Sequence, residues 1–487
     1  MTAPVTTRIA PSPTGDPHVG TAYQALFNYV YARQHAGKFI VRIEDTDRTR
    51  YSAASEDKIL NMLDWIGLTP DASPRHEDDR GPYTQSQRAG LHQQLAQQLL
   101  DEGKAYRAFD TSEELEARRK AAEASGESYR GYDRRDRELS REESDRRAAA
   151  GEPFVIRLKV PLTGETVVRD RLRGDVVFQN SELDDKVLLK ADGFPTYHLA
   201  AMADDHLMGV THVIRAEEWL TSTPIHIQIL QAFGWEQPEW IHTPWLLGTG
   251  GKKLSKRRGD ASAASYIEMG VIREALLNYL GMMGWTMPPD PETGEPREIF
   301  SVQDMIEHFS WDRVSLGGSV FDLEKLKWLN GKYLREVLTP EQVRERLYSY
   351  LSERGFTAPN DDYFAQVVVM LTPRIELLGE FLAKTPYFWS EDYPVTDKAA
   401  TLIAEGQDLL RAARERLAGL PDFRHDTTDV ALRALAQELG VKPGKLMQPL
   451  RAAVAGTSES PGLFELLEAL GQARVLDRLD RALQPAG

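Results

Sequence analysis

The sequence has 487 residues, which at about 100–200 residues per domain corresponds to roughly three to five compact units. Hydrophobic residues make up 41% and charged residues 27%, which is ordinary for a globular protein and excludes a disordered or fibrous chain. The formal charge of −15 excludes a protein that coats nucleic acid indiscriminately, and the absence of cysteine excludes disulfides, a cysteine nucleophile and thiolate zinc sites.

The first predicted elements form a β-α-β unit. A strand at residues 7–10 leads through a loop of prolines and glycine into a helix at about 18–33, and a second strand spans 38–44. Such a unit opens the parallel sheets that bind nucleotides. We therefore expect an α/β fold that begins with a Rossmann-type parallel sheet.

The middle of the chain interrupts this pattern. A mixed-charge stretch at about 115–147 is expected to be helical or loose, and solvated. Residues 154–160 and 175–178 are apolar and β-rich, which indicates a small α+β domain inserted into the sheet. The sheet is predicted to resume at 195–198 and 212–215.

The pattern beyond residue 320 is almost wholly helical, with Leu-rich periodic segments at 341–353, 400–420 and 428–439. No stretch approaches the roughly 18 uncharged apolar residues of a transmembrane helix. Prolines and Arg8 stand where a signal peptide would have its apolar run. We therefore expect a cytoplasmic protein without a membrane partner.

The loop before the first helix is a candidate phosphate site. A helix start offers free backbone N–H groups and the positive end of the helix dipole. His18 is suited to bond ATP phosphates during adenylyl transfer, and Gly20, which lacks a Cβ, would let adenine approach the backbone. The alternative is a helix N-cap with an incidental histidine, because a lone Pro-His-x-Gly is a weak signal.

A glycine-rich basic loop at 250–259 is the second candidate. It is not a phosphate-binding P-loop, because the glycine required directly before Lys-Ser/Thr is absent. The ammonium groups of Lys253 and Lys256 are suited to stabilise charge on a departing pyrophosphate, and the glycines permit closure over it. The alternative is a solvated basic loop.

The two motifs, PHVG (17–20) and KLSKR (253–257), resemble the paired signatures of class I aminoacyl-tRNA synthetases, His-Ile-Gly-His and Lys-Met-Ser-Lys-Ser. Further blocks resemble the glutamyl branch of that family, in its order: RIAPSPTG (8–15), RIEDTDR (42–48), PTYHLA (195–200), IRAEEW (214–219), VFDLEKL (320–326) and LNGKY (329–333). The departures are Thr21 for the second histidine, and Leu254 and Arg257 for Met and Ser. Residues 105–109 lack the zinc-binding cysteines of some relatives, which implies a zinc-free insert.

This resemblance implies that ATP activates L-glutamate to glutamyl-adenylate, and that the glutamate is then transferred to the 3′ terminal adenosine of tRNA(Glu). ATP with Mg²⁺ is the implied cofactor, no metal is held by the protein itself, and the chain is expected to be a monomer. The implied catalytic residues are His18, Lys253 and Lys256. The implied ATP-binding residues are His18, Gly20, Glu218, Trp219, Leu247 and Lys256. The implied glutamate-binding residues are Arg8, Ala10, Ser12, Glu44, Tyr197 and Arg215.

The implied roles in the glutamate site follow charge. Arg8 and Arg215 would face the two substrate carboxylates, because desolvated carboxylates require fixed cationic partners. Glu44 would pair with the α-amino group, while Ser12 and Tyr197 would add hydroxyl contacts. An unpaired buried arginine at 215 would reject the neutral amide of glutamine. Taken singly, each arginine has the alternative of a surface salt bridge.

The family also implies a domain order. A split catalytic domain spans 1–84 and 197–240, an inserted acceptor-stem-binding domain 85–196, a stem-contact domain 241–335, and two helical anticodon-binding domains 336–395 and 396–487. Arg374 resembles the arginine that in discriminating members reads the third anticodon base. Its alternative is a helix-surface arginine, and whether tRNA(Gln) is also charged stays open.

Three other interpretations compete with this one. A short paralogue that glutamylates a modified tRNA base lacks the helical half, so the length of this chain argues against it. A catalytically inactive RNA-binding or regulatory protein with this fold is the second, and the intact residues His18, Lys253, Lys256, Arg8 and Arg215 argue against it. A simple nucleotidyltransferase would need neither the insert nor the helical half.

Overall fold

A computed structural model describes residues 4–125, 132–248, 250–251, 254, 262–358 and 361–484. The chain divides into two compact units. The first unit contains Met1–Ser265 and Leu276–Asp322, and the second contains Tyr266–Ala275 and Leu323–Gly487. Helices α8 (Ala263–Met269) and α9 (Arg273–Gly284) are shared between them.

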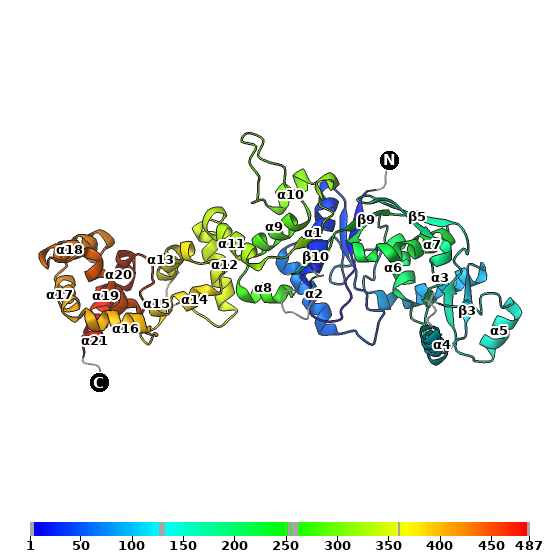
Figure 1. The fold of residues 1–487 in the computed structure, drawn as a ribbon, viewed down its shortest axis with the longest axis horizontal. Coiled ribbons are helices and arrows are strands. Elements are labelled where there is room, and N and C mark those ends of the chain that lie inside the picture. The colour runs from blue at the N-terminus through cyan, green and yellow to red at the C-terminus, as the bar shows by residue number, and fades with distance from the viewer. Residues whose placement is uncertain are drawn as a thin grey trace. The chain divides into compact units, whose positions relative to one another are not determined.

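Two parallel strand pairs lie next to each other at the centre of the first unit (Figure 1). One pair is β2 (Lys38–Val41) with β1 (Thr6–Ile9), and the other is β8 (His212–Ala216) with β9 (Glu239–Thr243). Between the two pairs, the N–H of Thr211, the residue before β8, donates to the carbonyl of Thr6 in β1 at 3.0 Å. Helix α1 (Val19–Gln34) connects β1 to β2, so the predicted β-α-β unit and the predicted strand at 212–215 are confirmed.

The segment between α3 (Ala89–Asp101) and β8 extends the sheet of β8 and β9 and also builds a separate sheet. Strand β5 (Glu165–Asp170) pairs in parallel with β9 and antiparallel with β6 (Gly174–Gln179). A separate antiparallel sheet has the order β3 (Ala105–Ala108), β4 (Val155–Leu158) and β7 (Val187–Leu189). The mixed-charge stretch, expected to be helical or loose, contains most of α4 (Ser112–Ser125) and of α5 (Arg141–Ala149).

The strand predicted at 195–198 is wrong. Pro195 forms only an isolated bridge with Leu189, and helix α6 (Tyr197–Leu207) begins two residues later. Apolar residues such as Leu199 and Met202 recur along α6 at helical spacing and are fully buried. A window of four residues is too short to distinguish a strand from the first turn of such a helix.

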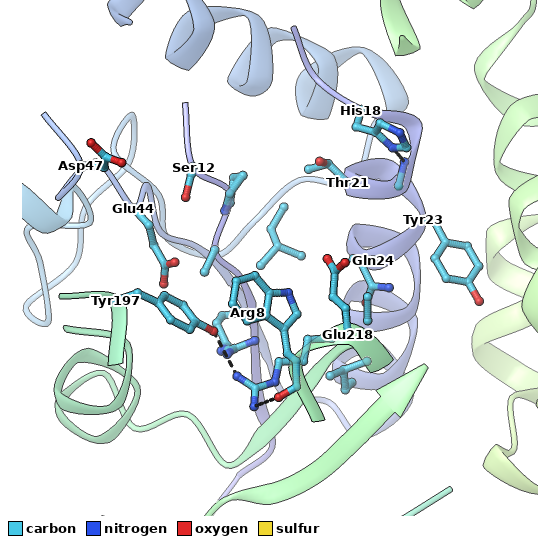
Figure 2. A pocket seen from close by; sticks show the side chains of 18 of the residues that line it. Arg8, Ser12, His18, Thr21, Tyr23, Gln24, Glu44, Asp47, Tyr197 and Glu218 are labelled. Atoms are coloured by element: carbon cyan, nitrogen blue, oxygen red, sulfur yellow. Dashed lines mark hydrogen bonds between the residues drawn. The ribbon is translucent and has the colours of Figure 1, made fainter. Parts of the chain in front are cut away.

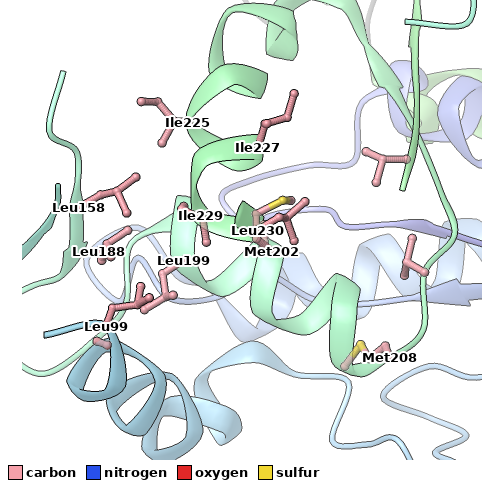
Figure 3. Packing of buried hydrophobic residues seen from close by; sticks show 14 of the residues in the cluster. Leu99, Leu158, Leu188, Leu199, Met202, Met208, Ile225, Ile227, Ile229 and Leu230 are labelled. Carbon is pink, nitrogen blue, oxygen red and sulfur yellow. The ribbon is translucent and has the colours of Figure 1, made fainter. Parts of the chain in front are cut away.

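One hydrophobic core ties these elements together (Figure 3). Leu99 of α3, Leu158 of β4 and Leu188 of β7 pack in the same cluster as Met202 of α6 and Leu230 of α7 (Thr223–Phe233). Burying a leucine or methionine side chain stabilises a fold by about 1.5–3 kcal/mol. The inserted segment therefore shares its core with the helices that cover the parallel strands.

The first unit has further elements that contribute no residue to this cluster. The elements are α2 (Ala53–Ile66), α10 (Val302–His308) and the parallel pair β10 (Leu246–Leu247) and β11 (Ser319–Val320). Gln34, the last residue of α1, donates from its side-chain amide to the carbonyl of Phe309 at 2.9 Å. This contact fixes the end of α10 against α1.

The second unit is helical, as the sequence predicts. Its helices are α11 (Leu323–Lys332), α12 (Pro340–Ser352), α13 (Asp361–Leu371), α14 (Glu380–Lys384), α15 (Pro386–Trp389), α16 (Asp397–Glu405), α17 (Gln407–Ala418), α18 (His425–Glu438), α19 (Pro443–Ala455), α20 (Leu463–Leu470) and α21 (Gln472–Ala482). The segment predicted at 400–420 is broken at Gly406. A Cβ at Gly406 would lie 2.5 Å from the Cβ of Pro449, so this break lets α19 approach closely.

Candidate active site

A cavity of about 910 Å³ lies in the first unit (Figure 2). It opens where β1, β2 and β8 end, which is where open parallel sheets bind ligands. Its volume is within the range of about 300–1,000 Å³ typical of small-molecule sites. The predicted site residues that line it are Arg8, Ala10, Ser12, His18, Gly20, Glu44, Tyr197, Arg215, Glu218 and Trp219.

Arg8 lies on β1 and is already paired with a carboxylate. Its Nε and Nη2 donate to the two carboxylate oxygens of Asp205 at 3.0 and 3.1 Å. Arg42 donates to the same carboxylate from Nη1 at 2.7 Å. Burial alone would raise the pKa of Asp205, but the two guanidinium groups outweigh it and hold that pKa below its ordinary value. Asp205 thus fixes the orientation of Arg8 at the edge of the cavity.

Glu44 follows β2 and is the buried anion of the cavity wall. Arg42 donates to its Oε1 from Nη2 at 3.2 Å. Burial raises the pKa of Glu44 to about 7, although Arg42 and Arg8 act in the opposite direction. A second cation beside this carboxyl, such as the ammonium group of a substrate, would stabilise its ionised form.

Arg215, at the end of β8, is buried with only 6% of its surface exposed. It donates to the OH of Tyr197 (3.1 Å), His242 Nε2 (3.1 Å), His226 Nδ1 (3.2 Å), the carbonyl of Trp219 (3.3 Å) and Thr223 Oγ1 (2.8 Å). All these acceptors are neutral, and no carboxylate among the described residues forms an ion pair with Arg215. Burial accordingly lowers the pKa of Arg215. Such a cation favours an anionic ligand.

Histidines complete the surroundings of Arg215. Burial lowers the pKa of His242 and of His198 to about 4, and that of His226 well below its ordinary value. His226 Nε2 lies 3.2 Å from His198 Nδ1, so one hydrogen bond links the two rings. Neutral imidazoles accept hydrogen bonds without adding charge, which leaves the full positive charge of Arg215 for a ligand.

The first signature motif caps helix α1 and also lines the cavity. His18 is the N-cap residue, and its Nδ1 accepts the N–H of Gly20 at 2.9 Å. A Cβ at Gly20 would lie 2.9 Å from that nitrogen, so glycine is required here to make room for the ring. The two interpretations of His18 are therefore compatible, since a capping histidine can also face a ligand.

The chain just after the basic loop contacts the first motif, and one described residue of the loop lines the cavity. After the loop, Ser262 bridges to His18, and the N–H of Ala263 donates to the carbonyl of Pro17 at 3.2 Å. Within the loop, the buried Leu254 lines the cavity. These contacts bring the two signature motifs together, although they are more than 230 residues apart in the sequence.

The remaining predicted residues differ in what the structure says of them. Lys253 and Lys256 lie outside the described residues. Leu247 does not line the cavity, whereas its neighbour Leu246 does. Trp219 is part of the wall, with its ring centroid 4.7 Å from that of Tyr197.

No cluster of His, Asp and Glu that could hold a metal ion is present in the part of the chain that the structure describes. Within the same residues, no helix has both the length and the apolar character needed to cross a membrane.

Two families match almost all of the chain. Residues 4–328 match the family of class I tRNA synthetases (E and Q), catalytic domain, and residues 339–483 match an anticodon binding domain. A glutamate–tRNA ligase of Thermus thermophilus is 52% identical over 98% of this chain and 100% of its own length. One of Deinococcus radiodurans is 50% identical over 99% of both chains.

The chain belongs to the glutamyl-tRNA synthetases.

Its fold agrees with this assignment. The crystal structure of a glutamate tRNA ligase from Elizabethkingia meningosepticum, in complex with its amino acid, matches 99% of this chain and 100% of that chain, with a TM-score of 0.89 and 34% identity. The expected family, fold class and enzyme class are confirmed. As a class I aminoacyl-tRNA synthetase, the chain uses ATP.

Sequence analysis missed the partners of both arginines in this synthetase. Asp205 follows Tyr197 by eight residues on α6, a spacing that places both on one helix face, so helical periodicity offered a signal for it. His242 gave no such signal. It reaches Arg215 only because β8 and β9 pair in a register that sets these two residues side by side.

Arg374 belongs to the second unit. It ends the short helix Thr372–Arg374, its side chain is exposed, and its carbonyl accepts Lys384 Nζ at 2.8 Å. No ion pair to a described carboxylate is found for it. Its proposed contact with the anticodon stays a prediction.

Proposed function

We propose that this chain is a glutamate–tRNA ligase that converts L-glutamate, ATP and tRNA(Glu) to glutamyl-tRNA(Glu), AMP and diphosphate. The observation that supports it most is the buried guanidinium of Arg215, surrounded by neutral acceptors in a cavity that also contains Glu44. A free amino acid with a second carboxylate supplies an ammonium beside Glu44 and a carboxylate beside Arg215, the two groups that lack a full counter-charge. Its other carboxylate would lie beside Arg8, which Asp205 already holds in place.

In the proposed reaction, a carboxylate oxygen of the glutamate α-carboxyl attacks the α-phosphorus of ATP. The bond to the bridging oxygen breaks, diphosphate leaves, and glutamyl-adenylate forms. A ribose hydroxyl of the terminal adenosine of tRNA then attacks the acyl carbon, and AMP leaves. Neither step forms a covalent bond to the protein, so catalysis rests on orientation and charge stabilisation.

The phosphates of ATP would lie at the start of α1, beside His18 and Gly20. This position offers the positive end of the helix dipole. Lys253 and Lys256 would stabilise the departing diphosphate, with Mg²⁺ carried by ATP as in other phosphoryl transfers. Glu218, Trp219 and Leu247 are proposed neighbours of the nucleotide, and Ala10, Ser12 and Tyr197 of the amino acid.

The second unit is proposed to bind the anticodon, with Arg374 reading its third base, because guanidinium groups bond and stack on unstacked bases. We further propose the family's five-domain division, a monomeric enzyme, a zinc-free insert, and a cytoplasmic site of action.

The test is exchange of labelled pyrophosphate into ATP by the purified protein. We expect exchange only when glutamate and tRNA are both present, and we expect glutamine not to replace glutamate. Exchange that glutamine supports equally well would disprove the proposed specificity of the pocket. Exchange without any amino acid would indicate a simple nucleotidyltransferase instead.

A further inference from the structure

Behind Arg215 lies a buried histidine and behind that histidine a buried carboxylate. Nε of Arg215 donates to Nε2 of His242 at 3.1 Å, and Nδ1 of His242 lies 2.6 Å from Oδ2 of Asp170. Both residues behind Arg215 are shielded from solvent, because His242 is 0% exposed and Asp170 is 4% exposed.

Arg215 and Asp170, at the two ends of this series of hydrogen bonds, determine which nitrogen of His242 carries the ring proton. An arginine only donates hydrogen bonds, and an ionised aspartate only accepts them. The single proton of the neutral His242 ring must therefore lie on Nδ1, facing Asp170, so that Nε2 offers its lone pair to Arg215. Burial lowers the pKa of His242 to about 4, which keeps the ring in this neutral form near pH 7.

Asp170 is itself immobilised. Its Oδ1 accepts the N–H groups of Leu172 and Arg173, both at 3.0 Å, and its Oδ2 also accepts the N–H of His242 at 3.1 Å. Asp170 ends β5 at the point where this strand pairs with β9, so the carboxylate is held by two strands at once. The hydrogen bonds from Asp170 lead to Arg215 by way of the His242 imidazole ring.

We infer that Asp170 and His242 are positioning residues that hold the Arg215 guanidinium in place for the side-chain carboxylate of the amino acid, and so determine the preference for glutamate over glutamine. The inference rests on the proposed function and deepens it. A direct aspartate partner would neutralise Arg215 and compete with the ligand. A neutral histidine between them fixes the orientation of the guanidinium and leaves its charge available.

A purely structural role is the rival explanation, since Asp170 also holds a turn. Two substitutions at one position separate the explanations. The amide of His242→Asn occupies the place of Nδ1, so it retains the bond to Asp170 and loses the one to Arg215. The amide of His242→Gln reaches the place of Nε2, so its oxygen still accepts from Arg215 while the bond to Asp170 is lost.

The measurement is the dissociation constant of L-glutamate by calorimetry, together with kcat and KM for charging tRNA with glutamate and with glutamine. We expect His242→Asn to weaken glutamate binding about tenfold or more, as loss of a hydrogen bond to a charged group does, and to reduce the preference over glutamine. We expect His242→Gln to stay within about threefold of wild type. Equal glutamate affinities for the two folded variants would overturn the inference.

A second pair of variants keeps the test decisive if one of these proteins does not fold. Asp170→Asn presents an amide N–H to Nδ1 and shifts the ring proton to Nε2, against the N–H of Arg215. Asp185→Asn is its matched control, because Asp185 is a fully buried carboxylate that accepts from Tyr106 and Arg137 away from the cavity. We expect both to lower the melting temperature, but only Asp170→Asn to raise KM for glutamate.

The outcomes also separate this inference from the proposed function. Wild-type protein that does not charge tRNA with glutamate would disprove the proposed function, and the inference with it. Wild-type protein that charges normally, while Asp170→Asn and Asp185→Asn show the same KM for glutamate, would disprove the inference alone.

Discussion

Two buried arginines, one in each unit, have opposite surroundings. Arg478 of α21 donates from Nε and Nη2 to the carboxylate of Glu391 at 3.0 and 2.9 Å, and to the carbonyls of Val454 and Tyr387 at 2.6 and 2.7 Å. Arg215 donates only to neutral groups. The anion that pairs with Arg478 is a residue of the protein itself, whereas Arg215 lines a cavity in which an anionic ligand could bind.

The matching carboxylates show the same contrast. Arg478, with Arg474 and Arg481, lowers the pKa of Glu391 to about 2, so this carboxylate is saturated with cations. Glu391 is also 45% exposed, whereas Glu44 is buried, receives a hydrogen bond from one arginine, Arg42, and has its pKa raised by burial to about 7. A protein pairs its buried charges when they serve the fold alone. Charges that it buries without full pairing point to a ligand of the opposite sign.

The largest expected effect is on the unpaired arginine. Replacing Arg215 with Gln removes the cation that would bind a substrate carboxylate, so we expect kcat/KM for glutamate to fall about a thousandfold or more. The affinity for tRNA, measured by filter binding, should stay nearly unchanged. Undiminished charging with glutamate would show that Arg215 has a different role and would remove the contrast with Arg478.

Replacing the paired arginine, Arg478, should lower stability and leave catalysis nearly unchanged. Arg478→Met leaves two buried carbonyls without donors, so we expect the free energy of unfolding in urea to fall by about 2–4 kcal/mol. Charging with glutamate per folded molecule should stay near that of wild type. Arg215→Gln is the control here, and it should change stability much less, because folding then no longer buries an uncompensated cation. A stable Arg478→Met protein would show that this ion pair is dispensable.

Local patterns in the sequence predict the fold well. The β-α-β unit and the helical second unit follow from the spacing of apolar residues within each element and from the residues of the loops between the elements. The failures come from contacts between distant segments. The strand predicted at 195–198 is replaced from residue 197 by α6, because that helix packs into the core. The segment predicted at 400–420 is broken where Gly406 meets Pro449.

The candidate site divides in the same way. Its cavity residues lie within contiguous motifs, which is why resemblance to a family identifies them. Their partners do not, since Arg8 and Asp205 are 197 residues apart and Arg215 meets His242 through the register of two strands. Whether an arginine is paired or unpaired is therefore a property of the folded chain, and no motif reveals it.

Glu44, which is only partly compensated by Arg42, offers a test by pH. The pKa of about 7 for Glu44 lies above the ordinary value of 4.5, so the group is neutral below pH 7 and ionised above it. Only the ionised form can pair with a substrate ammonium. We expect the affinity for glutamate to fall as the pH drops from 8 to 6, approaching about tenfold per pH unit below the pKa.

Glutamate titrations by calorimetry at each pH would check this. Glu44→Gln should bind more weakly and lose the pH dependence. Melting temperatures at the same pH values would control for acid destabilisation. If the wild type has a flat profile between pH 6 and 8, Glu44 does not pair with the ammonium, and the contrast with Glu391 has no bearing on binding.

The smallest expected effect concerns an arginine that is unpaired but exposed. Arg374 has no described carboxylate partner, but its side chain is exposed, so its surroundings do not indicate a ligand as those of the buried Arg215 do. If it reads the anticodon, Arg374→Gln should change the ratio of kcat/KM for tRNA(Glu) to that for tRNA(Gln) by about fivefold, as a modest contact to a base does. Stability and glutamate affinity should stay unchanged.

Arg411, an exposed arginine of α17 paired with Asp408, is the matched control, and its substitution by Gln should leave the ratio as it is. An equal ratio for wild type and Arg374→Gln would show that Arg374 is a surface arginine without a role in reading the anticodon. An arginine without a carboxylate partner would then indicate a ligand in this chain only where it is buried, as Arg215 is.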